Sequence, residues 1–480
     1  MPDLQILYCA IGKALLEKHA IIHILILKIN IMSKVTYKNL EDKLNAHPSA
    51  VEMLRHSPTG GYEFPFPAQY TNWRDEQEAW QKSVVLFDQS FHMTDVYFEG
   101  PDVMRLLSDV GVNTVKNFGA NKAKQIVACN YDGHVIGDAI LFGHTDSKVS
   151  VVGRPSVPNW VHFQAETGGY DVKVTRDERT VSNDGSRLIY RYQIQGPNAL
   201  ELIKSVHEGE FPEIKFFNLG DLKIAGKKVR ALNHNMSRMG GLELHGPVED
   251  RDAVLEAILK KGPEFGLLMG GSRAYSTVSP ESGWIPSPMP AIYAGDKMKP
   301  YREWLSGDGF EANASLGGSF YSDKIEDYYQ TPWDLGYGKH IKFDHDFIGR
   351  EALEKLVDKP HRRKLWLKWN DEDVLKVFAS QLGHGERFKF MESPNAYYSI
   401  LPFDRVMIGD RMVGLSTYTV YTSNVRCWFS LAMLDEDVAD GAEVSVVWGE
   451  ENGGSRKPIV ERHAQTEIRA TVSHNRLNED

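Results

Sequence analysis

Hydrophobic and polar positions follow two periods along this chain, one typical of strands and one typical of helices. Val84–Asp88 is continuously apolar and Lys148–Gly153 alternates, as buried and half-buried strands do. Asn72–Ser83 places Trp73, Gln77 and Trp80 on one helical face. The predicted strands are Val84–Asp88, Asp95–Glu99, Asn121–Val127, Gly133–Phe142, Lys148–Gly153, Leu188–Gln195, Leu222–Leu232 as a hairpin, and Gly241–His245. The predicted helices are two short ones around Pro48, then Asn72–Ser83, Pro101–Val110, Asn159–Thr167, Asn198–Val206 and Arg251–Lys261.

The order of these elements is irregular, without the strict strand–helix alternation of a doubly wound sheet, and indicates an α+β fold. After a polar, basic segment at Asp358–Arg363, the pattern changes to strands separated by Gly and Asp turns, which predicts an all-β, barrel-like module. We therefore expect a large α+β region over 36–360 and a β domain over 361–480. The strands predicted there are Lys364–Trp369, Asp404–Leu415, Trp428–Leu434 and Glu443–Trp448.

The first 35 residues stand apart from this pattern. Ala20–Ile31 is apolar but short, and His23 and Lys28 interrupt it. A membrane-spanning helix needs about 20 apolar residues, and no small-residue cleavage site of a signal peptide follows. Our hypothesis is that 1–35 is an extension of which the part before Met32 does not belong to the native protein.

One stretch, Ser272–Pro290, concentrates candidate chemistry. It carries Tyr275, Glu281 and Trp284, and four prolines and Gly283 interrupt it, so it cannot form one long helix. A constrained loop with polar and aromatic side chains is suited to holding a ligand. An ordinary surface connection explains the pattern equally well.

Composition and charge narrow the function classes. The formal charge is −10 and no long basic run occurs, which disfavours a nucleic-acid or anionic-membrane surface. The three cysteines are scattered, as expected in a reducing compartment such as the cytoplasm. Neither a dinucleotide nor a P-loop motif is present, and no histidines pair at metal-ligand spacing, so we expect no metal. The sequence does not indicate an oligomeric state.

Several motifs carry a family resemblance. TPWDLG (Thr331–Gly336), DFIGREAL (Asp346–Leu353), IGDRMVGLSTYT (Ile408–Thr419), QGPNA (Gln195–Ala199) and GLEL (Gly241–Leu244) resemble the folate-dependent aminomethyltransferase superfamily of the glycine cleavage system. The resemblance covers nearly the whole chain. It implies a three-domain fold, in which two interleaved α+β folate-binding subdomains precede a C-terminal β-barrel-like domain.

A narrower resemblance lies within that superfamily. Asn72–Met93 and Glu281–Leu305, with YDGHVIGD, EFGLLMGGSRAY and VVWGEENGGSRK, look like the tetrahydrofolate-dependent aryl O-demethylases of lignin-aromatic catabolism. These act on vanillate, 3-O-methylgallate or syringate and pass the methyl group to N5 of tetrahydrofolate. Aminomethyltransferases carry a paired Asp where this chain reads HVIGDAILF, so Gly137 replaces one carboxylate and Asp138 remains. A substrate without an amine does not need the missing carboxylate.

The resemblance also implies roles for residues around the transferred methyl group. The leaving group is a phenolate, and the phenol of Tyr275, with a reference pKa of ~10, is matched to protonate it. His92 would bond the ring hydroxyl beside the methoxy group or relay protons, and Gln89 would be a secondary hydrogen-bonding residue of the pocket. Arg154 would bind the substrate carboxylate, and Tyr62 lies in a Gly-rich loop predicted to expose it over the substrate. Ordinary structural roles compete with each assignment, such as a surface ion pair for Arg154.

The implied folate site has two parts. Glu243 matches the carboxylate that binds the amino-pyrimidine edge of the pterin, although an alternating strand also allows it to be a solvated surface residue. Trp284 is a candidate stacking wall, and the alternative for Glu281 is that it only holds its own segment in place. Two alternatives stay open: a related transferase with a sulfonium or aminomethyl donor, and a folate-binding protein without catalysis.

Overall fold

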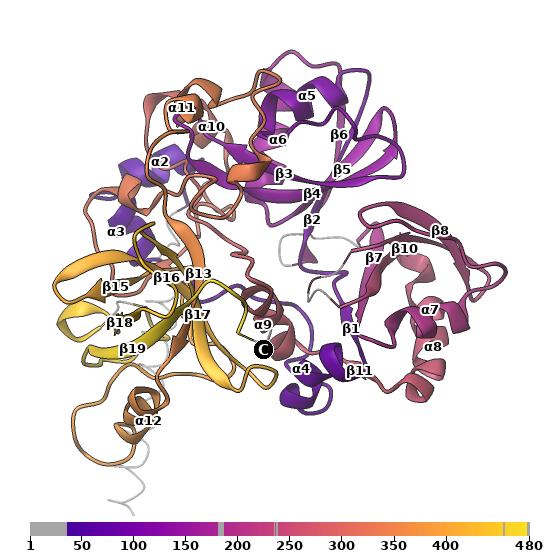
Figure 1. Ribbon diagram of the computed structural model, residues 1–480. Helices are drawn as coiled ribbons and strands as arrows, with labels where there is room; N and C mark the ends of the chain where they lie inside the picture. The colour runs from indigo at the N-terminus through magenta and orange to yellow at the C-terminus, as the bar shows by residue number, and fades with distance from the viewer. Residues whose placement is uncertain (1–35, 181–186, 235, 237–238, 455–456, 478–480) are drawn as a thin grey trace, which may run out of the picture.

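The computed structural model describes residues 36–180, 187–234, 236, 239–454 and 457–477. The extension 1–35 and the hypothesis about Met32 lie outside these residues. Within these ranges the chain is an α+β mixture that ends in a closed barrel, as predicted. No helix in this part of the chain has the length and apolarity to cross a membrane. Figure 1 shows three lobes, with helix α9 (Ser272–Ser282) between the barrel and the second sheet.

The first lobe is a five-stranded antiparallel sheet in the order β3-β4-β5-β2-β6. Strands β3 and β4 form the predicted hairpin around Gly133, which has φ +78°. Helix α5 buries Val103, Leu106, Leu107 and Val110, one face at helical spacing, in the largest core cluster. The elements are β2 (Thr94–Glu99), α5 (Val103–Val110), β3 (Ala123–Cys129), β4 (Val135–Thr145), β5 (Lys148–Gly153), α6 (Ser156–Thr167) and β6 (Lys173–Asp177).

The second lobe is a six-stranded sheet in the order β11-β1-β7-β10-β9-β8. Strand β1 is buried at all five positions, as its apolar run predicts, and pairs with β7 and β11. Because β1 precedes β2 in the chain and β7 follows β6, the two sheets are interleaved as predicted. The elements are β1 (Val84–Asp88), β7 (Ile189–Gln195), α7 (Ala199–Val206), β8 (Leu219–Ile224), β9 (Lys227–Leu232), β10 (Gly241–Pro247), α8 (Arg251–Lys261) and β11 (Leu267–Met269).

The third lobe is a closed barrel in the order β13-β17-β16-β15-β18-β19, filled by residues such as Trp369, Val446 and Trp448. The barrel begins at Arg363. The domain boundary between residues 360 and 361 stays a prediction. Its elements are β13 (Arg363–Trp369), α12 (Asp371–Ala379), β15 (Asp404–Ile408), β16 (Arg411–Thr422), β17 (Cys427–Leu434), β18 (Glu443–Trp448) and β19 (Thr466–Ser473).

Two predictions about this module were wrong. It is not all-β, because α12 forms where Asn370 caps the helix by accepting from the Asp373 N–H and three acidic residues occupy the first turn. The single strand predicted over Asp404–Leu415 is two strands, since the chain reverses between Ile408 and Arg411 and pairs with itself. The alternation over Thr466–Ser473 also forms a strand that was not predicted.

The prediction of a loop at the start of Ser272–Pro290 was also wrong. Ser272–Ser282 is a helix, and Pro280 is tolerated because it sits in the last turn, where it removes a single backbone hydrogen bond. Gly283 ends the helix with φ +79°. A Cβ at Gly283 would lie 2.3 Å from Cζ2 of Trp366, so the glycine allows the barrel to approach α9 closely.

Polar contacts from the barrel fix α9 and its neighbour α4 (Trp73–Lys82). Gln77 of α4 donates to the Tyr421 carbonyl and accepts from the Ser423 N–H. The carboxylate of Glu281 accepts from Trp80, Gln81 and Asn424. Glu281 therefore ties two helices to the barrel. The other elements are α2 (Leu40–Asn45), α3 (Ala50–Arg55), α10 (Lys299–Trp304), β12 (Leu316–Gly317), α11 (Arg350–Glu354), β14 (Leu401–Pro402) and the 3₁₀ turns Val248–Asp250, Gly262–Phe265, Asp296–Met298, Ile325–Tyr328, Gly338–His340 and Glu451–Gly453.

Candidate active site

Tyr275 lies at the centre of a buried polar group. Helix α9 carries it, and its hydroxyl lies 3.0 Å from His92 Nε2 and accepts a hydrogen bond of 3.0 Å from Gln89 Nε2. Gln89 and His92 belong to the turn that joins β1 to β2. Because Gln89 donates to the phenol oxygen, the phenol proton is directed to His92. Three of the residues predicted from the sequence therefore form one hydrogen-bonded set.

Burial keeps this set neutral. It raises the pKa of Tyr275 well above its usual value, because the phenolate would lose its hydration. Burial, with the charges of Arg154, Arg187 and other arginines, lowers the pKa of His92 to about 3. His92 Nδ1 is buried and has no hydrogen-bond partner in the described part of the chain. At neutral pH the site thus holds a phenol proton donor next to an uncharged imidazole.

Aromatic rings surround Tyr275. Phe64, Phe66 and Phe87 pack edge-on against its ring, with centroids 5.1, 5.7 and 5.1 Å away. These three residues were not predicted, although the EFPFP run at Glu63–Pro67 marks a constrained aromatic segment. The surrounding rings exclude water, which strengthens the hydrogen bonds of the Tyr275 hydroxyl.

Tyr62 and Arg154 adjoin this set on one side. The Tyr62 hydroxyl donates to the His92 carbonyl, and the guanidinium carbon of Arg154 lies 4.2 Å from the centre of the Tyr62 ring. Arg154 also donates to Ser287 Oγ. The expectation that the loop exposes Tyr62 was wrong, because the hydrogen bond and the arginine hold the ring in the protein, where it is 9% exposed.

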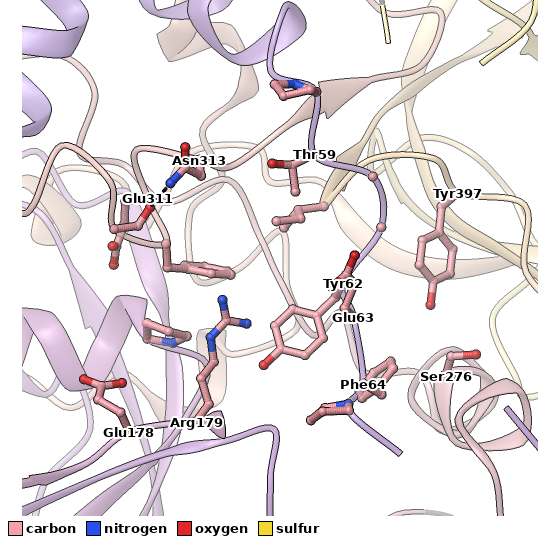
Figure 2. Close-up of a pocket in the computed structure, with 18 of the residues that line it drawn as sticks. Thr59, Tyr62, Glu63, Phe64, Glu178, Arg179, Ser276, Glu311, Asn313 and Tyr397 are labelled. Carbon is pink, nitrogen blue, oxygen red and sulfur yellow. Dashed lines mark hydrogen bonds between the residues drawn. The ribbon is translucent and has the colours of Figure 1, made fainter. Parts of the chain in front are cut away.

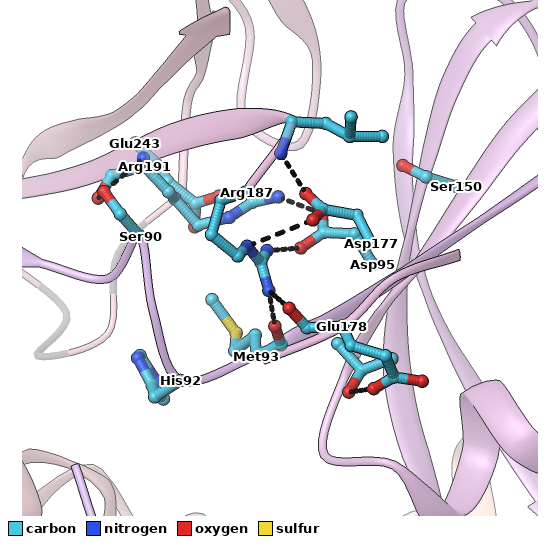
Figure 3. Close-up of polar contacts among 12 residues, drawn as sticks. Ser90, His92, Met93, Asp95, Ser150, Asp177, Glu178, Arg187, Arg191 and Glu243 are labelled. Atoms are coloured by element: carbon cyan, nitrogen blue, oxygen red, sulfur yellow. Dashed lines mark hydrogen bonds and ion pairs between the residues drawn. The ribbon is translucent and has the colours of Figure 1, made fainter. Parts of the chain in front are cut away.

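Glu243 occupies a buried charge network rather than the surface, so the alternative of a solvated carboxylate is excluded (Figure 3). It pairs with Arg191, which is also bonded at 2.6 Å to Asp95. Asp95 in turn bonds Arg187 at 2.7 Å. This network was not predicted, although an arginine within the apolar strand LIYRYQIQ was a signal for it.

Trp284 and Asp138 form a third part of the site. The indole N–H of Trp284 donates to Asp138 Oδ2 at 3.2 Å, and Gln125 donates to the same oxygen at 2.6 Å. Burial raises the pKa of Asp138. A small pocket lies beside this group, and its lining includes Gly137, Asp138, Arg154 and Ser287.

A cavity of about 1470 Å³ opens between the loop 58–65, α6, α9 and the barrel segment 392–400 (Figure 2). Tyr62 and Phe64 line it, but Tyr275, His92 and Glu243 do not. Phe64 stands between the cavity and Tyr275, since its ring contacts both Tyr275 and His92. Tyr275 and Arg154 are therefore connected through Tyr62 and His92, not across one open cavity.

The described residues contain no cluster of His, Cys, Asp or Glu side chains arranged to hold a metal ion. Buried polar atoms do remain without partners near Glu243 in this part of the chain, namely Gln89 Oε1, Gln193 Oε1 and His234 Nδ1. Gln193 pairs with Glu243 across neighbouring strands, and the Glu243 charge acts on His234. These atoms can bond the edge of a heterocycle that carries both donors and acceptors.

Comparisons with known proteins agree on one superfamily. Residues 55–287 match the family model of the GCVT N-terminal domain. The chain is 46% identical to syringate O-demethylase from Sphingobium sp. (strain NBRC 103272 / SYK-6), over 91% of this chain and 95% of that protein. It is 27% identical to sesamin methylene transferase from Sinomonas sp. (strain No.22), over 74% of this chain and 80% of that protein.

The fold has a solved neighbour. The glycine cleavage system aminomethyltransferase T from Bartonella henselae superposes with a TM-score of 0.58 and 14% sequence identity. The alignment covers 88% of this chain and 95% of that one. At this identity the likeness concerns the fold alone, and it confirms the predicted three-domain α+β architecture.

Proposed function

Because the chain belongs to the tetrahydrofolate-dependent O-demethylases of the aminomethyltransferase superfamily, we propose that it demethylates a methoxylated aromatic acid. The methyl group passes to N5 of tetrahydrofolate, giving 5-methyltetrahydrofolate and a phenol or catechol. The observation that carries this proposal is the 46% identity to a syringate O-demethylase over 91% of the chain. Syringate, vanillate and 3-O-methylgallate are the proposed substrate class.

The proposed catalytic residue is Tyr275. Displacement at the methyl carbon releases a phenolate, and a neutral phenol of similar acidity can share its proton with the departing oxygen. His92, which its lowered pKa keeps uncharged at neutral pH, accepts a hydrogen bond from Tyr275 and holds the phenol in place. Gln89 orients the Tyr275 oxygen, and its hydrogen bond supports a role in the substrate site.

Tetrahydrofolate supplies the nucleophilic N5 that accepts the methyl group. The residues near Glu243 fit its pterin, since a carboxylate and the partnerless atoms of Gln193 and His234 offer acceptors and a donor to the ring edge. We propose Glu243 as the anchor of this edge and Trp284, whose indole Asp138 holds, as a wall for its face. Arg154 and Tyr62 are proposed to contact the aromatic acid.

Gly137 argues against an amine donor. The carboxylate that aminomethyltransferases place there is missing, while Asp138 is engaged with Gln125 and Trp284. The chain thus lacks the paired carboxylates that would hold an aminomethyl nitrogen.

The described cysteines, Cys129 and Cys427, are free and buried, which supports a reducing compartment such as the cytoplasm.

A direct assay tests the proposal. Purified protein is incubated with tetrahydrofolate and, in separate reactions, with syringate, vanillate or 3-O-methylgallate. We expect equal amounts of 5-methyltetrahydrofolate and demethylated acid from at least one of them, resolved by liquid chromatography. If folate binds but none of the three acids loses a methyl group, a folate-binding role without O-demethylation is favoured instead.

A further inference from the structure

Arg179 lies on the wall of the large cavity and has no assigned role. It follows β6 by two residues and projects beside Tyr62 (Figure 2). Its guanidinium carbon lies 5.3 Å from the centre of the Phe310 ring and 5.4 Å from that of Tyr62. Two aromatic rings therefore hold the cation against the cavity.

No hydrogen bond or ion pair of the Arg179 guanidinium is found within the described chain, and its Nε is buried without a partner. Two other arginines near it are occupied. Arg176 is bonded to Glu178 and Asn159, and Arg154 to Ser287. A guanidinium presents five donors, and burying one without a partner costs free energy that a bound anion would recover.

Two carboxylates of the cavity wall, those of Glu178 and Glu311, are bonded to other side chains. Glu178 is engaged by Arg176 and Thr94, and both oxygens of Glu311 accept from Asn159. The guanidinium N–H groups of Arg179 that have no partner among the described residues therefore face the cavity rather than another side chain.

The surroundings indicate the class of ligand. A planar guanidinium binds a carboxylate through two parallel hydrogen bonds, and the flanking rings of Tyr62, Phe64 and Phe310 offer apolar walls for an aromatic ring. An aryl carboxylate satisfies both requirements at once. Arg154, by contrast, is tied through Ser287 to the segment after α9, which leaves fewer of its donors for a ligand.

We propose that Arg179 is the carboxylate anchor of the aromatic acid, in a subsite of the large cavity between Tyr62 and Phe310. This inference rests on the proposed function for the identity of the acid. It adds a second arginine to the proposed substrate site: Arg179 pairs with the substrate carboxylate, and Arg154, which is held by Tyr62 and Ser287, contacts the acid beside Tyr62.

The test compares charged and neutral ligands. Dissociation constants for syringate and for its uncharged amide are measured by calorimetry with wild-type protein, Arg179→Gln and Arg179→Lys. Arg179→Gln removes a charge-assisted pair and is expected to weaken syringate binding by about 10- to 100-fold. Arg179→Lys should lose less, because lysine keeps the positive charge but cannot form two parallel hydrogen bonds. Binding of the amide should change less than about threefold, because it never paired with the cation.

Arg273→Gln is the matched control. Arg273 also lines the cavity but is exposed to solvent, and its removal should change syringate affinity less than about threefold. The Arg179→Lys variant and the thermal transition of each protein show whether the fold is retained. The proposal is overturned if Arg179→Gln weakens acid and amide equally, if it weakens neither, or if wild-type protein binds no syringate.

This outcome is separate from that of the proposed function. Wild-type protein that binds syringate through Arg179 but transfers no methyl group to tetrahydrofolate would keep the subsite and refute the demethylase activity. Turnover of syringate with an unchanged Michaelis constant in Arg179→Gln would refute the subsite and keep the activity.

Discussion

At the scale of single residues, the Tyr275 hydroxyl is the group on which the proposed chemistry depends. Tyr275→Phe removes the proton donor and keeps the ring that packs against Phe64 and Phe87. We expect kcat to fall by about 10²- to 10⁴-fold, the usual contribution of general acid catalysis, with the dissociation constant for tetrahydrofolate changed less than threefold. Single-turnover kinetics and folate titration measure the two quantities. Equal losses in both would assign Tyr275 to folate binding.

The pH dependence of kcat/KM provides a second residue-scale test. With the pKa of His92 lowered to about 3 and that of Tyr275 raised above its usual value, neither group changes charge near neutrality. We expect kcat/KM for syringate to vary less than about twofold between pH 6 and pH 8. A rise with a midpoint near 6.5, the ordinary histidine value, would show instead that His92 titrates as a base.

The sequence predicted the functional groups better than their surroundings. Tyr275, His92 and Gln89 come together as expected, because they occupy motifs that the resemblance places in one site. Phe64, Arg191 and Asp95 were not predicted, since their roles arise from contacts between segments far apart in the chain. The burial of Tyr62 was missed for the same reason: its partners, Arg154 and the His92 carbonyl, come from other elements.

At the scale of elements, helix α9 shows how tertiary contacts override local preference. The prolines and Gly283 predicted a loop, but Pro280 sits in the last turn and Glu281 is bonded to α4 and the barrel. The helices α2, α3 and α4 were predicted correctly, and each has an Asn or Ser at its N-cap that stabilises it locally. What local sequence cannot show is that Trp366 of β13 requires a glycine at 283.

Gly283→Ala tests that contact. The new Cβ would meet both a positive φ and the Trp366 ring 2.3 Å away, so we expect a loss of about 2–4 kcal/mol in the free energy of unfolding. Gly226→Ala is the control, because Gly226 has φ +73° and nothing within 4 Å, and should lose only about 1 kcal/mol. Urea unfolding of both variants gives the comparison. Equal losses would mean that α9 and the barrel do not need this close approach.

At the scale of the whole molecule, a buried charge network joins the two interleaved sheets. Asp95 comes from β2 of the first sheet, and its partners Arg187 and Arg191 precede and lie within β7 of the second. Figure 3 shows Arg191 reaching Asp95 and Glu243 together. The predicted interleaving of the two sheets is therefore accompanied by an electrostatic link that the sequence pattern alone did not reveal.

Asp95→Asn should weaken this electrostatic link strongly. The buried guanidinium groups of Arg187 and Arg191 would then lose the negative charge that they share. We expect a loss of about 3–5 kcal/mol in the free energy of unfolding, seen as a lower thermal midpoint. Asp102→Asn, in an exposed pair with Arg105, is the control and should lower the thermal midpoint far less. An Asp95→Asn protein as stable as wild type would show that the arginines find other partners.

The place of β1 in the chain has a consequence for biosynthesis. This strand is apolar and buried at every position, yet its two partners, β7 and β11, end only at Gln195 and Met269. At about 5–20 residues per second, a ribosome needs on the order of ten seconds or longer to travel from Asp88 to Met269. During that interval at least one edge of this apolar strand lacks its partner, which leaves the nascent chain open to misassociation.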